Sequence, residues 1–362
     1  MHLASFVSPH GFGHAARTSA ILRACAENNP DFQVQIFTRV PRWFFDESIE
    51  GLFDYHETHC DVGFVQRSAL EFDFPGTLQA LSAFIPFEQR LIADLAGRIV
   101  RAGCSAVLCD ISPLGIAVAH AARLPSILIE NFTWDWLYEP LQAEFPAIER
   151  YRALLRQTFA GATHHIQTLP ICVPSERARL VSPPVARLPR RKRAEVRQQL
   201  GVQSDQRMIL ITMGGVRQPM PFLSQLKKLS HVTFLITGSV QDHWHDNLIQ
   251  IAQDTRVYVP DLLHAADAVI AKLGYGTVAE VWTLGKPMAY VARNFRESAS
   301  LKDFVDREIP SFEITADSFH RGDWIDRIGE LLSLAAPEGE RRSGAGAIAD
   351  YIGRVLAGHV AR

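Results

Sequence analysis

Lys272-Leu-Gly-Tyr-Gly-Thr-Val-Ala-Glu280 is the stretch that decides the fold. It follows a short apolar run and precedes residues with helical periodicity, so it predicts a strand, a tight turn and a helix. The two glycines, Gly274 and Gly276, let the backbone approach a ligand closely. The predicted helix begins at Thr277, where free N–H groups and the positive end of the helix dipole favour an anion. The stretch therefore predicts a phosphate site at the end of a buried strand.

Glu280 lies one turn into that predicted helix and has two interpretations. Its carboxylate can accept hydrogen bonds from a ribose diol. Thr277-x-x-Glu280 is also a capping box, in which the glutamate only satisfies amides at the start of the helix. The spacing alone favours neither interpretation.

The order of strand, turn and helix recurs along all 362 residues. Apolar, β-branched runs alternate with helical periodicity, which predicts an α/β fold of doubly wound parallel sheets. Expected strands cover residues 3–7, 33–38, 106–109, 126–129 and 164–168, then 208–212, 232–237, 256–259, 268–271 and 287–292. The chain is too long for one ordinary core, so we expect two Rossmann-like domains that face a cleft. Residues 77–102 are expected to form one helix, and residues 40–80 otherwise show no clear pattern.

The expected domain boundary is a proline-rich, basic stretch over residues 181–193. We expect an N-terminal domain over residues 1–182, a C-terminal domain over 183–340, and a final helix in 341–362 that packs back toward the first domain. The basic cluster is interpreted as a solvated linker, with contact to an anionic partner or membrane surface as the alternative.

Composition excludes several classes of protein. The formal net charge of −2 argues against a broad nucleic-acid surface, and no apolar run is long enough to cross a membrane. The chain starts directly on a strand without a signal peptide, and the 5 cysteines contain no Cys-x-x-Cys pair. We therefore expect a cytoplasmic protein with reduced cysteines. His164-His165 and His243-x-His245 lack the spacing of a metal site, so no metal is expected.

A second glycine-rich turn, Ser8-Pro-His-Gly-Phe-Gly-His14, follows the first strand. It contains Gly11 and Gly13 but lacks the P-loop and dinucleotide patterns. The imidazole of His14 can act as a base or hydrogen-bond donor at the start of the next helix. A helix-capping histidine is the alternative, and the spacing favours it slightly.

Two further strand ends carry polar or aromatic groups. Asp110 stands where parallel sheets place functional groups, and it can accept a proton or cap the helix that begins at Pro113. The loop of residues 130–136 holds Asn131 and Trp134 beside other aromatic residues. These aromatics can stack on a sugar or an acceptor, or they can form core under a loop, which is the commoner use of tryptophan.

On these residues the chain resembles GT-B glycosyltransferases, and its second half resembles the donor domain of MurG-like enzymes with a family 28-type donor domain. The matching strings are residues 257–270, 272–280 and 284–287. The strongest likeness is to the glycosyltransferase-like N-terminal region of plant L-arabinokinases and bacterial relatives. It rests on the glycine-turn stretch and on Asn131-Phe-Thr-Trp-Asp-Trp-Leu-Tyr138.

The resemblance implies a role for most of the candidate residues. A nucleotide-sugar donor would lie in the C-terminal domain, with Glu280 on the ribose and the backbone at Val259 beside the base. The implied diphosphate contacts are Gly214, Gly215, Gly274, Gly276 and Thr277. The implied acceptor-side residues are Gly11, Gly13, Asn131 and Trp134, with His14 or Asp110 deprotonating the acceptor. Such enzymes need no metal ion or cofactor, because the helix dipole takes over the role of a cation.

The sequence also departs from the MurG-like pattern. A pair of glutamines after the last donor strand is absent, and Arg296 and Glu297 occupy that sugar-facing place. The apolar patch that docks such enzymes on membranes is not found, so peripheral membrane contact has no support. We expect a hexosyl- or N-acetylhexosaminyl-transferase that uses a UDP-sugar and an unidentified acceptor. A nucleotide-sugar 2-epimerase and a non-catalytic sugar-nucleotide-binding module are the alternatives.

Overall fold

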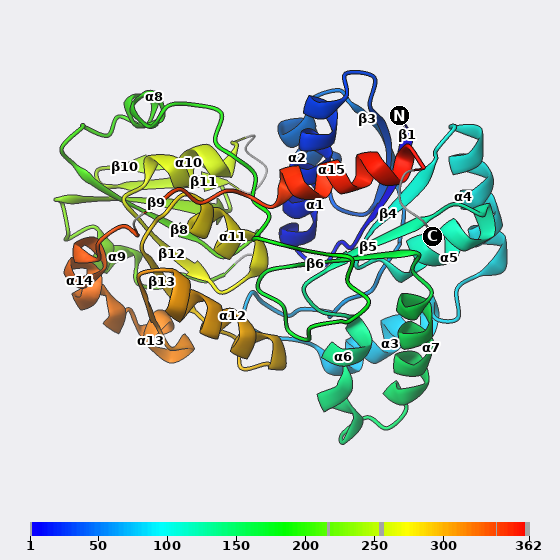
Figure 1. The fold of residues 1–362 in the computed structure, drawn as a ribbon. Coiled ribbons are helices and arrows are strands. Elements are labelled where there is room, and N and C mark those ends of the chain that lie inside the picture. The colour runs from blue at the N-terminus through cyan, green and yellow to red at the C-terminus, as the bar shows by residue number, and fades with distance from the viewer. Residues whose placement is uncertain (1, 216–217, 253–256, 338, 359–362) are drawn as a thin grey trace. The chain divides into compact units, whose positions relative to one another are not determined.

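The computed structural model describes residues 2–215, 218–252, 257–337 and 339–358 (Figure 1). The chain divides into two compact units. Unit 1 comprises Met1–Val65, Phe72–Val185 and Ser343–Arg362, and unit 2 comprises Gln66–Glu71 and Ala186–Arg342. Each unit contains a seven-stranded sheet, so the predicted α/β class is confirmed. The six residues Gln66–Glu71 belong to unit 2, although the sequence pattern placed them in the first domain.

The sheet of unit 1 is parallel throughout and has the order β3-β2-β1-β4-β5-β6-β7. Its strands are β1 (His2–Val7), β2 (Gln33–Thr38), β3 (Phe53–Glu57), β4 (Ala106–Asp110), β5 (Ser126–Glu130), β6 (His164–Thr168) and β7 (Leu180–Ser182). The strand order reverses between β1 and β4, where Val7 pairs with Asp110. Such a switch point is where parallel sheets bind ligands, and it brings together the two strand ends that the sequence singled out.

Helices cover the sheet of unit 1. They are α1 (Phe12–Asn28), α2 (Arg42–Ile49), α3 (Phe74–Phe84), α4 (Gln89–Arg101), α5 (Pro113–Ala122), α6 (Trp134–Leu137), η1 (Glu139–Gln142), α7 (Ile148–Ala160) and α15 (Ala345–Leu356). The last of these lies beside α1, although the two are separated by nearly the whole chain (Figure 1). The Tyr351 hydroxyl and His164 Nδ1, 2.9 Å apart, also tie α15 to β6.

Two expectations for this unit are wrong. Residues 77–102 form two helices rather than one, because Pro86 lies in the break between α3 and α4 and supplies no backbone N–H. The stretch that showed no clear pattern contains α2 and β3. The strand β3 reads Phe-Asp-Tyr-His-Glu, and its polar composition hid it because it is the edge strand.

The sheet of unit 2 has the order β10-β11-β9-β8-β12-β13-β14, and β10 pairs antiparallel with β11. Its strands are β8 (Arg207–Thr212), β9 (Val232–Ser239), β10 (His243–His245), β11 (Leu248–Ala252), β12 (Ala268–Lys272), β13 (Met288–Val291) and β14 (Ser311–Glu313). Its helices are α8 (Arg193–Gln199), α9 (Leu223–Leu226), α10 (Val259–Ala265), α11 (Tyr275–Thr283), α12 (Arg296–Glu308), α13 (Ala316–Arg321), η2 (Asp323–Arg327) and α14 (Ile328–Ser333). The order reverses between β8 and β12, so this sheet also has a switch point at its centre.

The strand expected over residues 256–259 is wrong. Val257 and Tyr258 are not in a strand, Val259 begins α10, and residue 256 lies outside the described residues. The sequence pattern missed β11, which pairs with β9, and it also missed the edge strands β10 and β14. Val257 and Tyr258 are β-formers, but the proline at position 260 suits the first turn of a helix and decides the local structure.

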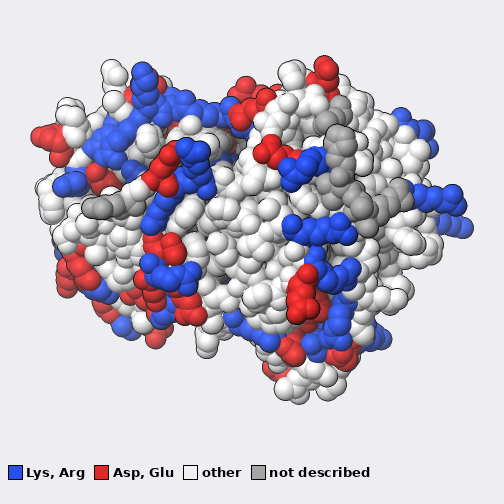
Figure 2. Space-filling model, in the orientation of Figure 1, with Lys and Arg blue, Asp and Glu red and all other residues white. Residues whose placement is uncertain are grey.

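The basic stretch after residue 181 is not a solvated linker. Figure 2 shows Lys and Arg side chains gathered over the α8 end of unit 2. Arg193 lies 2.7 Å from the Asp267 carboxylate, Arg197 lies 3.4 Å from it, and the Met208 amide donates to it at 2.8 Å. Burial alone raises the pKa of Asp267, but the amide and the arginines outweigh burial and lower it. These arginines therefore fasten the start of unit 2 to its own sheet.

Gly115 of α5 packs directly against the sheet of unit 1, so its substitution is expected to affect stability. A Cβ there would lie 2.7 Å from Phe6 Cβ and 2.9 Å from Cys109 Sγ. We expect Gly115→Ala to lower the free energy of unfolding by about 2 kcal/mol, because the helix must move away from a close-packed sheet. The measurement is urea denaturation of the variant and the parent protein.

Gly353→Ala in α15 is the matched control. Its Cβ would have no neighbour within 4 Å, so the same substitution should stabilise the protein by roughly 0.5 kcal/mol through the unfolded chain. Equal effects of the two substitutions would contradict the packing of α5 described above.

Candidate functional site

The turn after β1 brings His14 to the switch point of unit 1. Strand β1 ends at Val7, the Ser8 amide donates to the Asp110 carbonyl at 3.3 Å, and α1 begins at Phe12. The residue before the helix, Gly11, has φ 75°, a conformation that favours glycine. His14 therefore stands in the first turn of α1, close to the end of β4.

His14 and Asp110 form a hydrogen-bonded pair. His14 Nδ1 lies 2.8 Å from Asp110 Oδ1, while Thr18 Oγ1 and Arg17 Nε each donate to Oδ2 at 2.9 Å. Burial alone raises the pKa of Asp110, but Arg17 and then His14 outweigh it and lower the pKa to about 2. Because Asp110 is ionised and 1% exposed, it orients the histidine rather than meeting an acceptor. With Nδ1 donating to Asp110, Nε2 becomes the basic nitrogen of the neutral imidazole.

Arg17 extends the network from Asp110 to the next two strands. Its Nη1 donates to Asn131 Oδ1 and, at 3.3 Å, to Thr168 Oγ1. Asn131 Nδ2 in turn donates to the Thr168 carbonyl at 2.7 Å and to the Pro170 carbonyl at 3.1 Å. The buried Asn131 therefore holds the ends of β5 and β6 together. Our reading of the sequence missed Arg17, although its spacing of three from His14 puts both on one face of α1.

Trp134 is a core residue in this structure. It is 0% exposed, and its Nε1 donates to Asp61 Oδ2 at 2.6 Å. Burial raises the pKa of Asp61 to about 7, although Ser8 and Trp134 oppose this shift. The ring of Trp134 packs edge-on against His10, with centroids 5.3 Å apart. Of the two interpretations of this aromatic loop, the structure supports core for Trp134.

In unit 2 two glycine turns meet at the carboxyl ends of β8 and β12. Gly214 and Gly215 follow β8 with φ of 70° and 79°, which only glycine adopts readily. Gly274 precedes α11, which begins at Tyr275 rather than at Thr277. Gly276 and Thr277 consequently lie in the first turn of this helix, where backbone amides favour an anion.

Lys272 is the last residue of β12, and its side chain runs between the two turns. A Cβ on Gly214 would lie 3.5 Å from Lys272 Nζ, and one on Gly274 would lie 3.8 Å from its Cε. Burial, and then the nearby Arg293, lower the pKa of Lys272 to about 7, while Glu297 opposes them. Our reading of the sequence assigned no role to this lysine, although a cation that ends an otherwise apolar strand is the signal that points to it.

Glu280 is 4% exposed and does not form the predicted capping box, since Gly274 occupies the N-cap and no side chain caps the helix. Instead, Arg187 Nε donates to Glu280 Oε1 at 3.0 Å. Burial raises the pKa of Glu280, and Arg187 opposes that effect. The Arg187 guanidinium also lies 5.4 Å from the ring centroid of Tyr258, which directly precedes Val259. Arg187 thus contacts both Glu280, the candidate for the ribose, and Tyr258, the neighbour of the base candidate Val259.

Arg296 and Glu297 are the first two residues of α12, after Phe295 at its N-cap. Glu297 and Arg293 both act electrostatically on Lys272. The start of α12, which carries both residues expected to face the sugar, therefore lies near Lys272 and the glycine turns.

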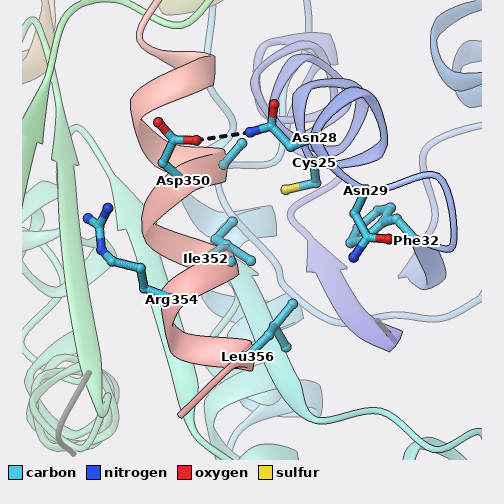
Figure 3. A pocket seen from close by; sticks show the side chains of 10 residues that line it. Cys25, Asn28, Asn29, Phe32, Asp350, Ile352, Arg354 and Leu356 are labelled. Carbon is cyan, nitrogen blue, oxygen red and sulfur yellow. Dashed lines mark hydrogen bonds between the residues drawn. The ribbon is translucent and has the colours of Figure 1, made fainter. Parts of the chain in front are cut away.

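A cavity of unit 1 lies away from these groups. It is found where the end of α1 meets α15, and its lining includes Cys25, Asn28 and Asp350 (Figure 3). Asn28 Nδ2 donates to Asp350 Oδ1 at 2.9 Å, and burial raises the pKa of Cys25 to about 12. At 1.5 Å per helical residue, Cys25 lies about 16 Å along α1 from His14. The cavity therefore holds none of the candidate residues.

The described ranges contain neither a metal-binding cluster nor a membrane-spanning helix. There, no cluster of three or more His, Cys, Asp or Glu residues is arranged to hold a metal ion. No helix within those ranges has the length and apolar character needed to cross a membrane.

The chain is similar in sequence to a much longer protein. L-arabinokinase of Arabidopsis thaliana is 28% identical over 345 residues, which cover 91% of this chain and 32% of that protein. The chain thus spans about a third of the length of this curated relative.

Solved structures share the fold at low identity. UGT89C1 of Arabidopsis thaliana in complex with UDP has a TM-score of 0.60 at 14% identity, with 99% of both chains covered. The glycosyltransferase VinC in complex with dTDP has a TM-score of 0.59 at 14% identity, covering 99% of this chain and 95% of that one. These likenesses confirm the GT-B fold.

The family follows from a match that covers most of the sequence. Residues 1–299 match the family described as glycosyl transferase family 1. The chain belongs to glycosyl transferase family 1.

Proposed function

We propose that the chain transfers a hexosyl or N-acetylhexosaminyl group from a nucleoside-diphosphate sugar to an acceptor hydroxyl or amine. The hydrogen bond of 2.8 Å between His14 Nδ1 and Asp110 Oδ1 carries this proposal. It is the arrangement that a histidine base needs, with one ring nitrogen held by a carboxylate and the other available to take a proton.

The proposed reaction is a single displacement at the anomeric carbon. His14 Nε2 removes the proton from the acceptor nucleophile, which forms a bond to that carbon. The bond between the carbon and the diphosphate oxygen breaks, and the nucleoside diphosphate leaves with the electron pair. Asp110 stabilises the imidazolium that forms, and it stays ionised throughout because its pKa is about 2.

We assign the acceptor to unit 1. Gly11 ends the turn that presents His14, Gly13 precedes His14 in the first turn of α1, and Asn131 holds the strand ends together. Trp134 supports this frame from the core, in contact with His10. The acceptor-side role of Asn131 and Trp134 is thus to position the turn, because both side chains are buried.

We assign the donor to unit 2 and propose UDP as its nucleotide. Structures of the same fold are known in complex with UDP and with dTDP. The diphosphate is assigned to the turns at Gly214, Gly215 and Gly274 and to the first turn of α11, which contains Gly276 and Thr277. Glu280 is assigned to the ribose and the backbone at Val259 to the base. Arg296 and Glu297 are assigned to the sugar.

Replacement of His14 tests the proposed base. His14→Gln leaves the pair of Arg17 and Asp110 intact, so the variant should fold. We expect kcat/KM for transfer to fall at least about 100-fold, because the acceptor proton has no receiver. The affinity for UDP, measured by calorimetry, should stay that of the parent protein, since His14 lies in unit 1.

Two results would contradict this assignment. Transfer above a tenth of the parent rate in His14→Gln would exclude the histidine as the base. Conversion of the nucleotide sugar without any acceptor would indicate an epimerase instead.

Replacement of Gly214 tests the donor site. Gly214 has φ 70° and borders Lys272, so Gly214→Ala puts a methyl group where the diphosphate is assigned. We expect its UDP affinity to fall about tenfold, in line with one charged hydrogen bond. A thermal-shift titration with UDP measures this change.

Gly201→Ala is the matched control for backbone strain. Gly201 also has φ 70°, but a Cβ there would meet nothing within 4 Å. Both variants should lose a similar stability of about 1 kcal/mol without ligand, and only Gly214→Ala should lose affinity. An equal loss of affinity in both variants would refute the placement of the diphosphate.

A further inference from the structure

Lys272 is a buried lysine at the carboxyl end of β12. It is 8% exposed at the end of β12, where residues Ala268–Ala271 are fully buried. Among the residues that the structure describes, no hydrogen bond or ion pair engages its ammonium group. Burying an ammonium without partners is costly, so its retention points to a ligand that supplies the missing negative charge.

Lys286 shows what a structural lysine looks like in the same unit. Its Nζ donates to the His264 carbonyl at 3.0 Å and to the Ala266 carbonyl at 2.8 Å. Lys286 therefore has a structural role, because its ammonium group donates to the backbone carbonyls at the end of α10. Among the described residues Lys272 makes no comparable hydrogen bonds, so the contacts described do not account for its burial.

The surroundings of Lys272 define the shape and charge of the missing partner. Its Nζ lies at the turn of Gly214, and its Cε lies at the turn of Gly274 that precedes α11. Gly214 and Gly274 themselves have no side chain beside the ammonium. The first turn of α11 adds backbone amides and the positive end of a nine-residue helix. The charged groups nearby are Arg293, after β13, and Glu297, on α12.

We infer that Lys272 binds the diphosphate of the nucleotide donor and stabilises the charge that develops on it as the sugar leaves. This inference rests on the proposed function and adds a residue to it. The lysine supplies a full positive charge between the glycine turns, whereas the amides of α11 supply partial charges. The role requires a protonated Lys272 in the complex, which the anion itself favours.

Lys272→Met tests the inference, because methionine keeps most of the side-chain length and removes the charge. Affinities for uridine, UDP and inorganic pyrophosphate are measured by calorimetry and competition. We expect binding of UDP and pyrophosphate to weaken at least about tenfold, the loss of one charged contact, while uridine binding stays unchanged.

The same variant gives a second readout through stability without ligand. Lys272→Met should unfold at a temperature equal to or above that of the parent, because it removes a buried charge. Lys286→Met, the matched control, should unfold at a lower temperature, because its two carbonyl acceptors lose their donor. The ratio of UDP to uridine affinity in this control should stay unchanged.

The pH dependence of UDP binding distinguishes the contribution of Lys272 from that of other cationic side chains. As pH rises through about 7, Lys272 loses its proton in the unliganded protein. The parent should therefore lose UDP affinity between pH 7 and 8.5 relative to Lys272→Met, which has no proton to lose. Arg293 and Glu297 remain in both proteins, so the difference between the two profiles reports Lys272.

Two results would overturn the inference. If Lys272→Met binds UDP within about twofold of the parent affinity, Lys272 does not contact the diphosphate. A parallel loss of UDP and uridine affinity with a lower unfolding temperature would make the lysine structural. A parent protein that binds neither UDP nor any other nucleoside diphosphate would instead refute the proposed function, on which the inference depends.

Discussion

The carboxylate of Asp110 is the group around which unit 1 is organised. It ends a buried strand and is therefore withdrawn from water, so it must be compensated by its neighbours. Arg17, Thr18 and His14 supply that compensation from a single helix face. The same set of contacts therefore fixes the orientation of α1, the orientation of His14 and the ionised state of Asp110.

Unit 2 handles charge at its switch point in a different way. Glu280 is neutralised by Arg187 within the unit. Lys272 is buried to a similar degree, yet its ammonium has no such partner among the described residues. The charge of Glu280 is compensated within the folded chain. We infer that the charge of Lys272 is compensated by an anionic ligand. Gly214 and Gly274 lie beside the lysine and have no side chain there, which makes this arrangement sterically feasible.

The two sheets were predictable from sequence because their central strands are largely continuous apolar runs. The edges were not: polar β3 was missed, and Val257 and Tyr258 were assigned to a strand that the proline of α10 excludes. His14 and Asp110 could be identified as candidates because they follow or end predicted strands, where parallel sheets place functional groups. Long-range partners do not follow from local patterns.

The clearest such partners are Arg187 on Glu280 and Asp61 on Trp134. Each joins residues more than 70 positions apart in sequence. For this reason the burial of Trp134 and the absence of a capping box were found only in the structure. Family membership, in contrast, rests on a match that covers residues 1–299.

Acceptor-dependent release of UDP is the measurement that tests the central claim most directly. The full chain is incubated with UDP-sugars and a panel of hydroxyl and amine acceptors, and the products are followed by NMR. The account predicts that UDP and a glycosylated acceptor appear together, at equal rates, and only when both substrates are present. No turnover of any nucleoside-diphosphate sugar with any acceptor, or sugar conversion that needs no acceptor, would contradict it.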